Sequence, residues 1–310
     1  MALLAGADLV LELPFLFACS AGQDFASGAV ALLSEFADTI AFGMENPEAD
    51  IMKLVDAEGT EAFTEALRRE MSRGASYPKA HAIALDAAVP GAGDFIAKPN
   101  NMLALSYIRE IQREGYGLKV MKVKREGNFS SKAVRAGSLE MLPEFSKRLL
   151  AVAERSDEGR LWPLVQGVML RSRAEDLRRI YGISEGIEGL FLKHWKDAGN
   201  LDDFIGRCVC ARYTRAHIRR RLVYILLGLN REEASAAVSG GVPYARVLGF
   251  NGRGREILRG KKAITRLAEV EGERGRYFAD VEFRASQLYE LTLETPNFKR
   301  ETGKPVIIQP

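Results

Sequence analysis

The sequence contains few of the residues that build metal sites and disulfide frameworks. Among 310 residues there are only three histidines and three cysteines. The histidines form no H-x-x-H or H-E-x-x-H pattern, and the C-x-C pair at 208–210 lacks the usual spacing of metal ligands. We therefore predict no structural metal. The odd cysteine count, with Cys19 as the third, is typical of reduced thiols and predicts a cytoplasmic protein.

Long apolar runs are also missing. No stretch reaches the ~20 consecutive apolar residues that a membrane-spanning helix needs. The apolar N-terminus does not have the pattern of a secretory signal, because Asp8 and Glu12 interrupt it and the first basic residue is Lys53. We expect no segment that crosses a membrane.

The charge of the chain is unevenly distributed, although the net charge is only +3. Residues 1–150 contain 16 Lys and Arg against 20 Asp and Glu, a balance of −4, whereas residues 151–310 contain 28 against 21, a balance of +7. A basic second half points to a polyanionic partner such as RNA. A solvated basic face without a partner is an equally open interpretation. The length is typical of roughly two domains.

The segment from Lys98 to Arg135 predicts a helix, a strand and a second helix in close succession. Pro99 and the two asparagines after it begin the first helix, and Gly115 and Gly117 end it. The strand LKVMKV (118–123) follows, in which we expect the apolar side chains of Leu118, Val120, Met121 and Val123 to be buried.

The end of this strand predicts an anion site. Ligands of open α/β sheets bind outside the carboxyl ends of the strands, and helix N-termini there suit phosphate. Arg125 lies at that end, Ser130 and Ser131 begin the next helix, and Arg135 follows one turn later. An ordinary helix–strand–helix unit with surface arginines is the alternative interpretation.

Two more strands precede this unit. The stretch LVLELP (9–14) predicts a buried parallel strand, and TIAF (39–42) predicts a second one with Gly43 at its carboxyl end. Residues 48–73 predict an amphipathic helix. Strands that alternate with helices are typical of a parallel sheet covered by helices, so we predict an α/β domain over residues 1–143. After Pro143 the pattern becomes mainly helical and basic, which predicts a second domain over residues 144–310.

One predicted helix of the second half carries a cluster of arginines. Arg212, Arg215 and Arg219 are spaced to share one helix face, and Arg220 is adjacent. A stripe of this kind can contact nucleic-acid phosphates, and a solvated face is equally usual. The nearby GRGREIL (252–258) resembles a dinucleotide fingerprint only superficially, because no βαβ unit surrounds it.

Eight collinear stretches together resemble the bacterial tRNA(Met) cytidine acetate ligases, a nucleotidyltransferase-like family. They are AGADLVLELPF (5–15), AFG (41–43), GASYPKA (74–80), KPNNMLALSYI (98–108), YGISEGIE (181–188), RYTRAHIRRRLVYILLGL (212–229), YARVLGFNGRGREIL (244–258) and KPVIIQP (304–310). The resemblance implies a Rossmann-like nucleotidyltransferase domain followed by a helical tRNA-binding domain. It also implies that acetate and ATP form acetyl-adenylate, whose acetyl group passes to N4 of the wobble cytidine of elongator tRNA(Met). A Mg²⁺ ion is expected with the ATP.

The resemblance and the arginine pattern assign candidate binding residues. The predicted ATP contacts are Gly43, Asn100 or its neighbour Asn101, Arg125, Ser131 and Arg135, of which the last two match the family only partly. The predicted tRNA contacts are Arg212, Arg215, Arg219 and Arg220.

One departure from the family concerns catalysis. The family begins with a strand and a His-x-Gly-His motif whose histidines bind the triphosphate and stabilise the transition state. This sequence has no histidine before His81 and no such motif, and Met1 aligns with an internal position of the family. We therefore expect roughly one βαβ unit, with the first strand of the sheet, to be missing, which would expose sheet edge and apolar surface.

These features leave three functions open. The first is the acetate–tRNA ligase, for which we expect this chain alone to bind ATP poorly and not to catalyse adenylation. The second is a non-catalytic tRNA- or RNA-binding protein that uses the basic half. The third is a related nucleotidyltransferase that acts on a small phosphorylated metabolite.

Overall fold

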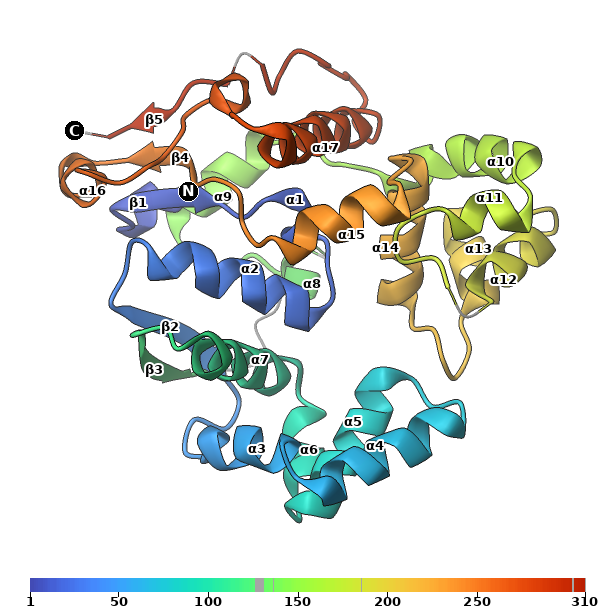
Figure 1. Cartoon of the computed structure of the whole chain (residues 1–310). Helices are drawn as coiled ribbons and strands as arrows, with labels where there is room; N and C mark the ends of the chain where they lie inside the picture. Colours follow the sequence, from blue (N-terminus) through green and yellow to red (C-terminus); the bar gives the residue numbers. More distant parts are fainter. Residues whose placement is uncertain (126–130, 136, 185, 303, 310) are drawn as a thin grey trace.

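A computed structural model describes residues 1–125, 131–135, 137–184, 186–302 and 304–309. Strands in two separate sheets and many helices make up an α/β fold (Figure 1). The first sheet has the order β1 (Leu9–Glu12), β4 (Arg246–Phe250), β5 (Ile307–Ile308). The second pairs β2 (Thr39–Met44) with β3 (Lys119–Lys124).

The parallel pairing predicted for the strands around 39–44 and 118–123 is confirmed. β2 and β3 run parallel with Gly43 opposite Val123 and Met44 opposite Lys124. The helix directly before β3, α7 (Pro99–Glu114), begins at the predicted proline and ends at Gly115, which has a left-handed φ of 67°. Only glycine adopts this conformation without steric cost, so local sequence fixed both ends of α7.

The prediction of a parallel first strand is wrong. β1 pairs antiparallel with β4, with Leu9 opposite Phe250 and Glu12 opposite Arg246. All four residues of β1 are only partly buried. The partner strand follows more than 230 residues later in the chain, so local sequence pattern could not indicate its direction. Through this pairing the two predicted domains share one sheet; the boundary near residue 143 stays a prediction.

The expected burial of β3 is also wrong, apart from Leu118 just before it, which is 8% exposed. Val120, Met121 and Val123 are 39%, 56% and 47% exposed. β3 is an edge strand that pairs only with β2 in the described part of the chain, and all six of its residues are exposed. Its lysines, Lys119, Lys122 and Lys124, keep the strand solvated.

Apolar surface is also open beside β1. Within the described residues β1 and β2 each pair on one side only. A hollow of about 540 Å³ adjoins β1. Apolar residues of β1, α2, α7, α16 and the turn after α2 line much of it, among them Leu9, Leu11, Leu33, Phe36, Tyr107 and Ile257. Sheet edge and apolar surface are therefore open in the described part of the chain, and the missing βαβ unit stays an expectation.

The first half contributes short helices around these strands. They are α1 (Phe15–Ala18), α2 (Gly22–Ser34), α3 (Ile51–Glu58), α4 (Glu61–Ser72), α5 (Tyr77–Ala88), α6 (Ala92–Ile96), α8 (Ser131–Arg135) and the 3₁₀ turn Leu3–Ala5. The stretch 48–73, predicted as helix, contains two helices, because Thr60 caps α4 with its side chain directly after Gly59. Helices α3–α6 gather on α7 as a separate lobe (Figure 1).

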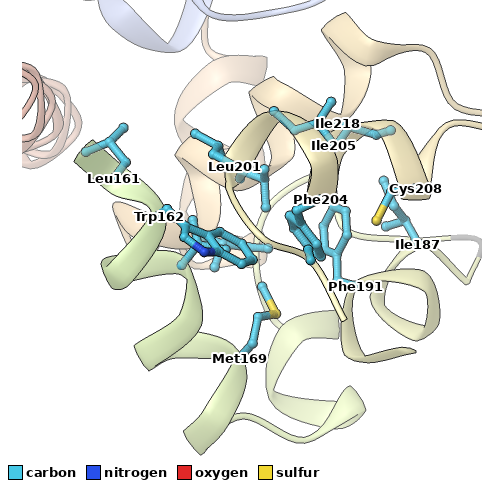
Figure 2. Packing of buried hydrophobic residues seen from close by; sticks show 14 of the residues in the cluster. Leu161, Trp162, Met169, Ile187, Phe191, Leu201, Phe204, Ile205, Cys208 and Ile218 are labelled. Carbon is cyan, nitrogen blue, oxygen red and sulfur yellow. The ribbon is translucent and has the colours of Figure 1, made fainter. Parts of the chain in front are cut away.

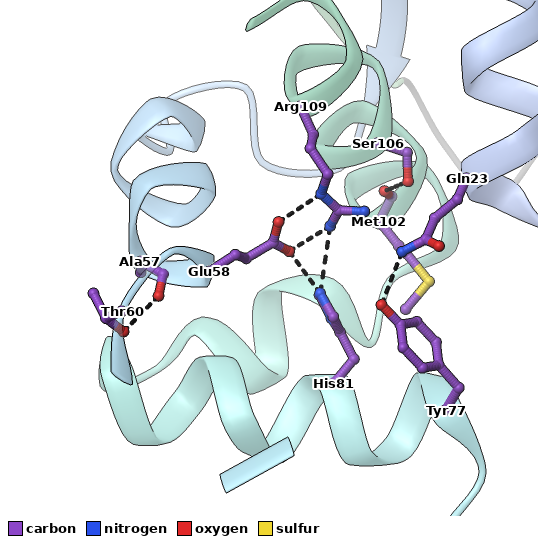
Figure 3. Close-up of polar contacts among 9 residues, drawn as sticks. All are labelled: Gln23, Ala57, Glu58, Thr60, Tyr77, His81, Met102, Ser106 and Arg109. Carbon is purple, nitrogen blue, oxygen red and sulfur yellow. Dashed lines mark hydrogen bonds and ion pairs between the residues drawn. The ribbon is translucent and has the colours of Figure 1, made fainter. Parts of the chain in front are cut away.

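A buried charged network fastens this lobe to α7. The Glu58 carboxylate accepts hydrogen bonds from the Arg109 guanidinium, with Nε at 2.5 Å, and lies 2.6 Å from His81 Nε2 (Figure 3). Burial alone would raise the pKa of Glu58, but hydrogen bonds from His81 and Arg109 outweigh it, and the pKa lies below its ordinary value. His81 is 3% exposed and serves packing between α5, α3 and α7.

The second half is mainly helical, as predicted. Its helices are α9 (Glu144–Val152), α10 (Trp162–Arg171), α11 (Ala174–Arg178), α12 (Ile187–His194), α13 (Leu201–Cys208), α14 (Arg215–Leu226), α15 (Arg231–Ser239), α16 (Gly252–Ile257) and α17 (Glu273–Glu290), with 3₁₀ turns at Glu158–Leu161 (η2) and Leu267–Glu269. Helices α10–α14 enclose an apolar core around Trp162, Phe191 and Phe204 (Figure 2). None of the described helices is long and apolar enough to cross a membrane.

Candidate functional site

Four of the predicted ATP-site residues meet at the carboxyl ends of β2 and β3. The Arg125 N–H, directly after β3, donates to the Met44 carbonyl oxygen at 3.0 Å. A Cβ built on Gly43 would lie 3.3 Å from Arg125 Cγ. The glycine therefore leaves room for the arginine stem beside it, and any larger side chain would displace that stem. Two residues that are 82 positions apart are brought together as the parallel-sheet prediction requires.

The N-terminus of α7 lies at the same place. Glu45, the residue after β2, accepts a hydrogen bond from Asn100 Nδ2 at 2.6 Å and one from the Asn101 backbone N–H at 3.1 Å. The Glu45 carboxylate thereby caps α7 from a neighbouring loop and complements the positive end of the helix dipole. Burial favours the neutral carboxyl, but the bonds to Asn100 and Asn101 and the charge of Arg125 outweigh it, so the pKa of Glu45 is lowered.

The two adjacent asparagines have different environments. Asn101 is fully buried, and its Oδ1 accepts from the N–H groups of Glu45 at 2.9 Å and Asn46 at 3.2 Å. Its Nδ2 donates to Asn46 Oδ1 at 3.1 Å and to the Phe95 carbonyl at 3.0 Å. The amide oxygen and the amide nitrogen of Asn101 thus each form two hydrogen bonds within the protein, which makes Asn101 a structural residue. Asn100 is partly exposed and is the better candidate for contact with a ligand.

Arg125 also lines a hollow. It has a volume of about 660 Å³, and Arg135, Pro143 and Phe145 line it together with Arg125. Arg125 and Arg135 therefore line the same hollow, and their predicted contact with one anion stays a prediction. Ser131 is the first residue of α8. Its side chain, and Ser130 with the rest of 126–130, lie outside the described residues.

The sequence pattern missed Glu45. It follows β2 directly, and an acidic residue at the carboxyl end of a strand, beside a predicted anion site, was the available signal. Its function here is to hold the asparagines of α7, which only the tertiary structure reveals.

The arginines predicted to bind tRNA lie on or just before α14. Thr214 caps this helix by accepting from the His217 N–H at 3.3 Å. Arg215 forms an ion pair with Asp202 of α13, and Arg219 contacts Glu158 at 2.6 Å and Asp202 at 3.7 Å. The shared face predicted for Arg215 and Arg219 is thus present, and acidic residues neutralise it. Arg212 is exposed in the preceding loop and lies near Gly74.

Arg220 and the neighbouring Arg221 point to a different part of the molecule. Both lie close enough to Cys19, between α1 and α2, to lower its pKa against the larger opposing effect of burial. Tyr224 of the same helix donates from its hydroxyl to the Cys19 carbonyl at 2.7 Å. The sequence pattern grouped the arginines by helical spacing alone. It therefore did not separate Arg220 and Arg221 from Arg215 and Arg219.

Comparisons with known proteins agree with this architecture. Residues 1–304 match the HIGH Nucleotidyl Transferase family. The tRNA(Met) cytidine acetate ligase of Clostridium perfringens is 32% identical over 304 residues, which cover 87% of this chain and 74% of that protein. The protein of the same name from Limosilactobacillus reuteri is 29% identical, with 99% and 84% of the two chains covered.

A solved structure has the same fold. It is that of Thermotoga maritima TmcAL bound with alpha-thio ATP, which superposes with a TM-score of 0.86 at 25% identity, over 99% of this chain and 85% of the other. The chain therefore belongs to the tRNA(Met) cytidine acetate ligase family of HIGH nucleotidyltransferases.

Proposed function

We propose that this chain is the ATP- and tRNA-recognising part of an ATP-dependent tRNA(Met) cytidine acetate ligase. The observation that carries the proposal is the meeting of Gly43, Asn100 and Arg125 at the carboxyl ends of two parallel strands. This is where nucleotides bind in open α/β sheets. The family relationship and the alpha-thio ATP of the Thermotoga maritima structure support ATP as the nucleotide.

In the proposed reaction, an acetate oxygen attacks the α-phosphate of ATP. Acetyl-adenylate forms and pyrophosphate leaves. The N4 amine of the wobble cytidine of elongator tRNA(Met) then attacks the acetyl carbon and releases AMP. Arg125 is suited to neutralise phosphate charge, and Asn100, held by Glu45, offers a fixed polar group. We propose Arg135 and Ser131 as further phosphate-side residues and the cytoplasm as the site of action.

The described residues contain no group of three or more His, Cys, Asp or Glu side chains that could hold Mg²⁺. The two carboxylate oxygens of Glu45 accept hydrogen bonds from Asn100 and Asn101. In this proposal the ion would be held by the oxygens of the triphosphate, and no step depends on a protein ligand for it.

Adenylation by residues 1–310 alone is not part of the proposal. The sequence lacks the His-x-Gly-His motif that would stabilise the charge developing on the triphosphate. We expect weak ATP binding and no acetate-dependent ATP–pyrophosphate exchange by this chain. Robust exchange would contradict this expectation.

The nucleotide site can be tested without turnover. We would titrate ATP into the protein to millimolar concentration and follow the ³¹P resonances, comparing Arg125→Gln with Lys119→Gln. Both changes remove one positive charge from the β3 region, but Lys119 lies at the opposite end of the strand. Line broadening should be lost in the first variant and kept in the second. Equal broadening in both variants would remove Arg125 from the site.

A second candidate is an RNA-binding protein without catalytic activity. The missing His-x-Gly-His motif together with Arg220 of α14 and the exposed Arg212 of the preceding loop favours it. Filter binding of elongator tRNA(Met) with and without ATP and acetate separates the two. If the chain belongs to a ligase, ATP and acetate should change its affinity for tRNA. If it is an RNA-binding protein without catalytic activity, its affinity for tRNA should stay the same.

A further inference from the structure

Helix α14 carries four arginines that fall into two pairs with opposite surroundings. Arg215 and Arg219 are paired with acidic residues of neighbouring elements, Asp202 of α13 and Glu158 of η2. All four of these side chains are substantially exposed, the arginines to 42% and 43%. Such pairs fasten α14 to its neighbours and leave little net charge on this face of the helix.

Arg220 and Arg221 are not paired in this way. Within the described part of the chain, no carboxylate or carbonyl oxygen accepts a hydrogen bond from either guanidinium. The Nε atom of each is buried without a partner, as is that of Arg219, but Arg219 has ion pairs through Nη2 and these two arginines have none among the described residues. Both side chains are partly buried. Arg221 packs its Cζ 5.4 Å from the centre of the Tyr224 ring, and its guanidinium lies against Gly182. The Arg221 guanidinium is therefore positioned by the Tyr224 ring and by the backbone at Gly182.

The described residues around this pair form no ion pair with it. Asp24 is close enough to Arg221 for its pKa to be affected: burial raises this pKa and the charge of Arg221 partly opposes the increase, without a hydrogen bond between the two side chains. Burial and the two arginines lower the pKa of His217 to about 4, so this ring is neutral near pH 7. Two adjacent, partly desolvated guanidinium groups without acceptors are costly unless a ligand supplies an anion.

We propose that Arg220 and Arg221 form the RNA phosphodiester site of α14, whereas Arg215 and Arg219 are positioning residues that hold the helix on α13 and η2. The inference rests on the proposed tRNA function and assigns the contact within it. Guanidinium groups bind phosphate oxygens through two parallel N–H donors, and fixed side chains lose little conformational freedom on binding. Contacts of this kind determine affinity and register rather than sequence preference.

The test compares two double variants that remove equal charge from one helix. Binding of elongator tRNA(Met) is measured by fluorescence anisotropy between about 50 and 200 mM salt for Arg220→Gln/Arg221→Gln and Arg215→Gln/Arg219→Gln. We expect the first to lose at least about tenfold in affinity and to reduce the slope of log affinity against log salt by ~2. The second should stay within about threefold of the unmodified chain, with the same slope.

Each outcome is decisive. A loss in the Arg215/Arg219 variant equal to that in the Arg220/Arg221 variant, or no loss in the latter, overturns the inference. If the unmodified chain does not bind tRNA, the proposed function itself fails, which is a separate result. Arg220→Lys/Arg221→Lys guards against misfolding: it should keep the salt slope but bind less tightly. Inorganic phosphate or ATP at constant ionic strength should not displace the tRNA; full displacement would assign the site to a small anion instead.

Discussion

Glu45 and Asn101 hold each other by reciprocal hydrogen bonds. The Asn101 Oδ1 accepts from the Glu45 backbone N–H at 2.9 Å, and the Glu45 Oε2 accepts from the Asn101 backbone N–H at 3.1 Å. The loop after β2 and the start of α7 are thereby locked in one geometry. Any nucleotide contact made by Asn100 depends on this lock, because Asn100 is bonded to the same carboxylate.

The first prediction concerns the two asparagines. Asn101→Ala removes a fully buried amide that makes four hydrogen bonds, and it should destabilise the fold by about 2–4 kcal/mol because buried partners are left unsatisfied. Asn100→Ala, one residue away and partly exposed, should cost about 1 kcal/mol or less. Urea unfolding measures the loss of stability in each of the two variants. Equal losses would mean that Asn101 is not the structural residue of the pair.

The second prediction concerns two glycines of α16. A Cβ at Gly254 would lie 2.0 Å from the Asp8 carbonyl oxygen, whereas a Cβ at Gly252 would meet nothing within 4 Å. Gly254→Ala should therefore force α16 away from β1 and destabilise the protein by about 2 kcal/mol or more. Gly252→Ala should change stability by less than about 1 kcal/mol. If both alanine variants unfold at the same urea concentration, the close approach is not a constraint.

The third prediction concerns acid stability. The lowered pKa of Glu58 means that its stabilising contribution is present above its ordinary value of 4.5 and is lost as the pH falls through the folded-state pKa. Glu58→Gln should cost about 3 kcal/mol at neutral pH, because it leaves Arg109 without its buried counter-charge, and less in acid. Glu65→Gln, on the exposed face of α4, should stay within about 0.5 kcal/mol throughout. Urea unfolding of both variants and the unmodified chain at pH 7 and in acid measures these differences in stability.

The fourth prediction concerns Glu282, for which stability should change with pH in the opposite direction. Burial, with repulsion from Glu12, raises the pKa of Glu282 to about 8, so the folded chain binds this proton more tightly than the unfolded chain. Stability should therefore decline as the pH rises from about 4.5 to about 8. Glu282→Gln keeps an acceptor for the Phe15 N–H and should flatten this decline, with a gain of about 1–3 kcal/mol at alkaline pH.

A matched variant controls for general charge effects. Glu271→Gln removes an exposed carboxylate just before α17 and should keep the pH dependence of the unmodified chain. A Glu282→Gln variant with the unmodified pH profile would show that this carboxyl group does not hold a proton in the folded protein.

Local sequence determined the unit around α7. Pro99 and Gly115 set the ends of the helix, and β3 follows within a few residues, so no distant contact was needed to predict it. The meeting of Gly43 with Arg125 was also predictable, because the carboxyl ends of neighbouring parallel strands lie at one edge of a sheet. Family resemblance supplied the chemistry that spacing alone could not.

Only the tertiary structure decided the rest. The direction of β1 depends on β4, more than 230 residues away, and no local pattern records such a pairing. Helical spacing placed Arg215 and Arg219 on one face. Asp202 and Glu158, from other segments, form ion pairs with these two arginines, whereas no described carboxylate pairs with Arg220 or Arg221. The sequence pattern determines on which face of a helix a side chain lies. The residues that this side chain contacts depend on how the helix packs against segments that are distant in the sequence.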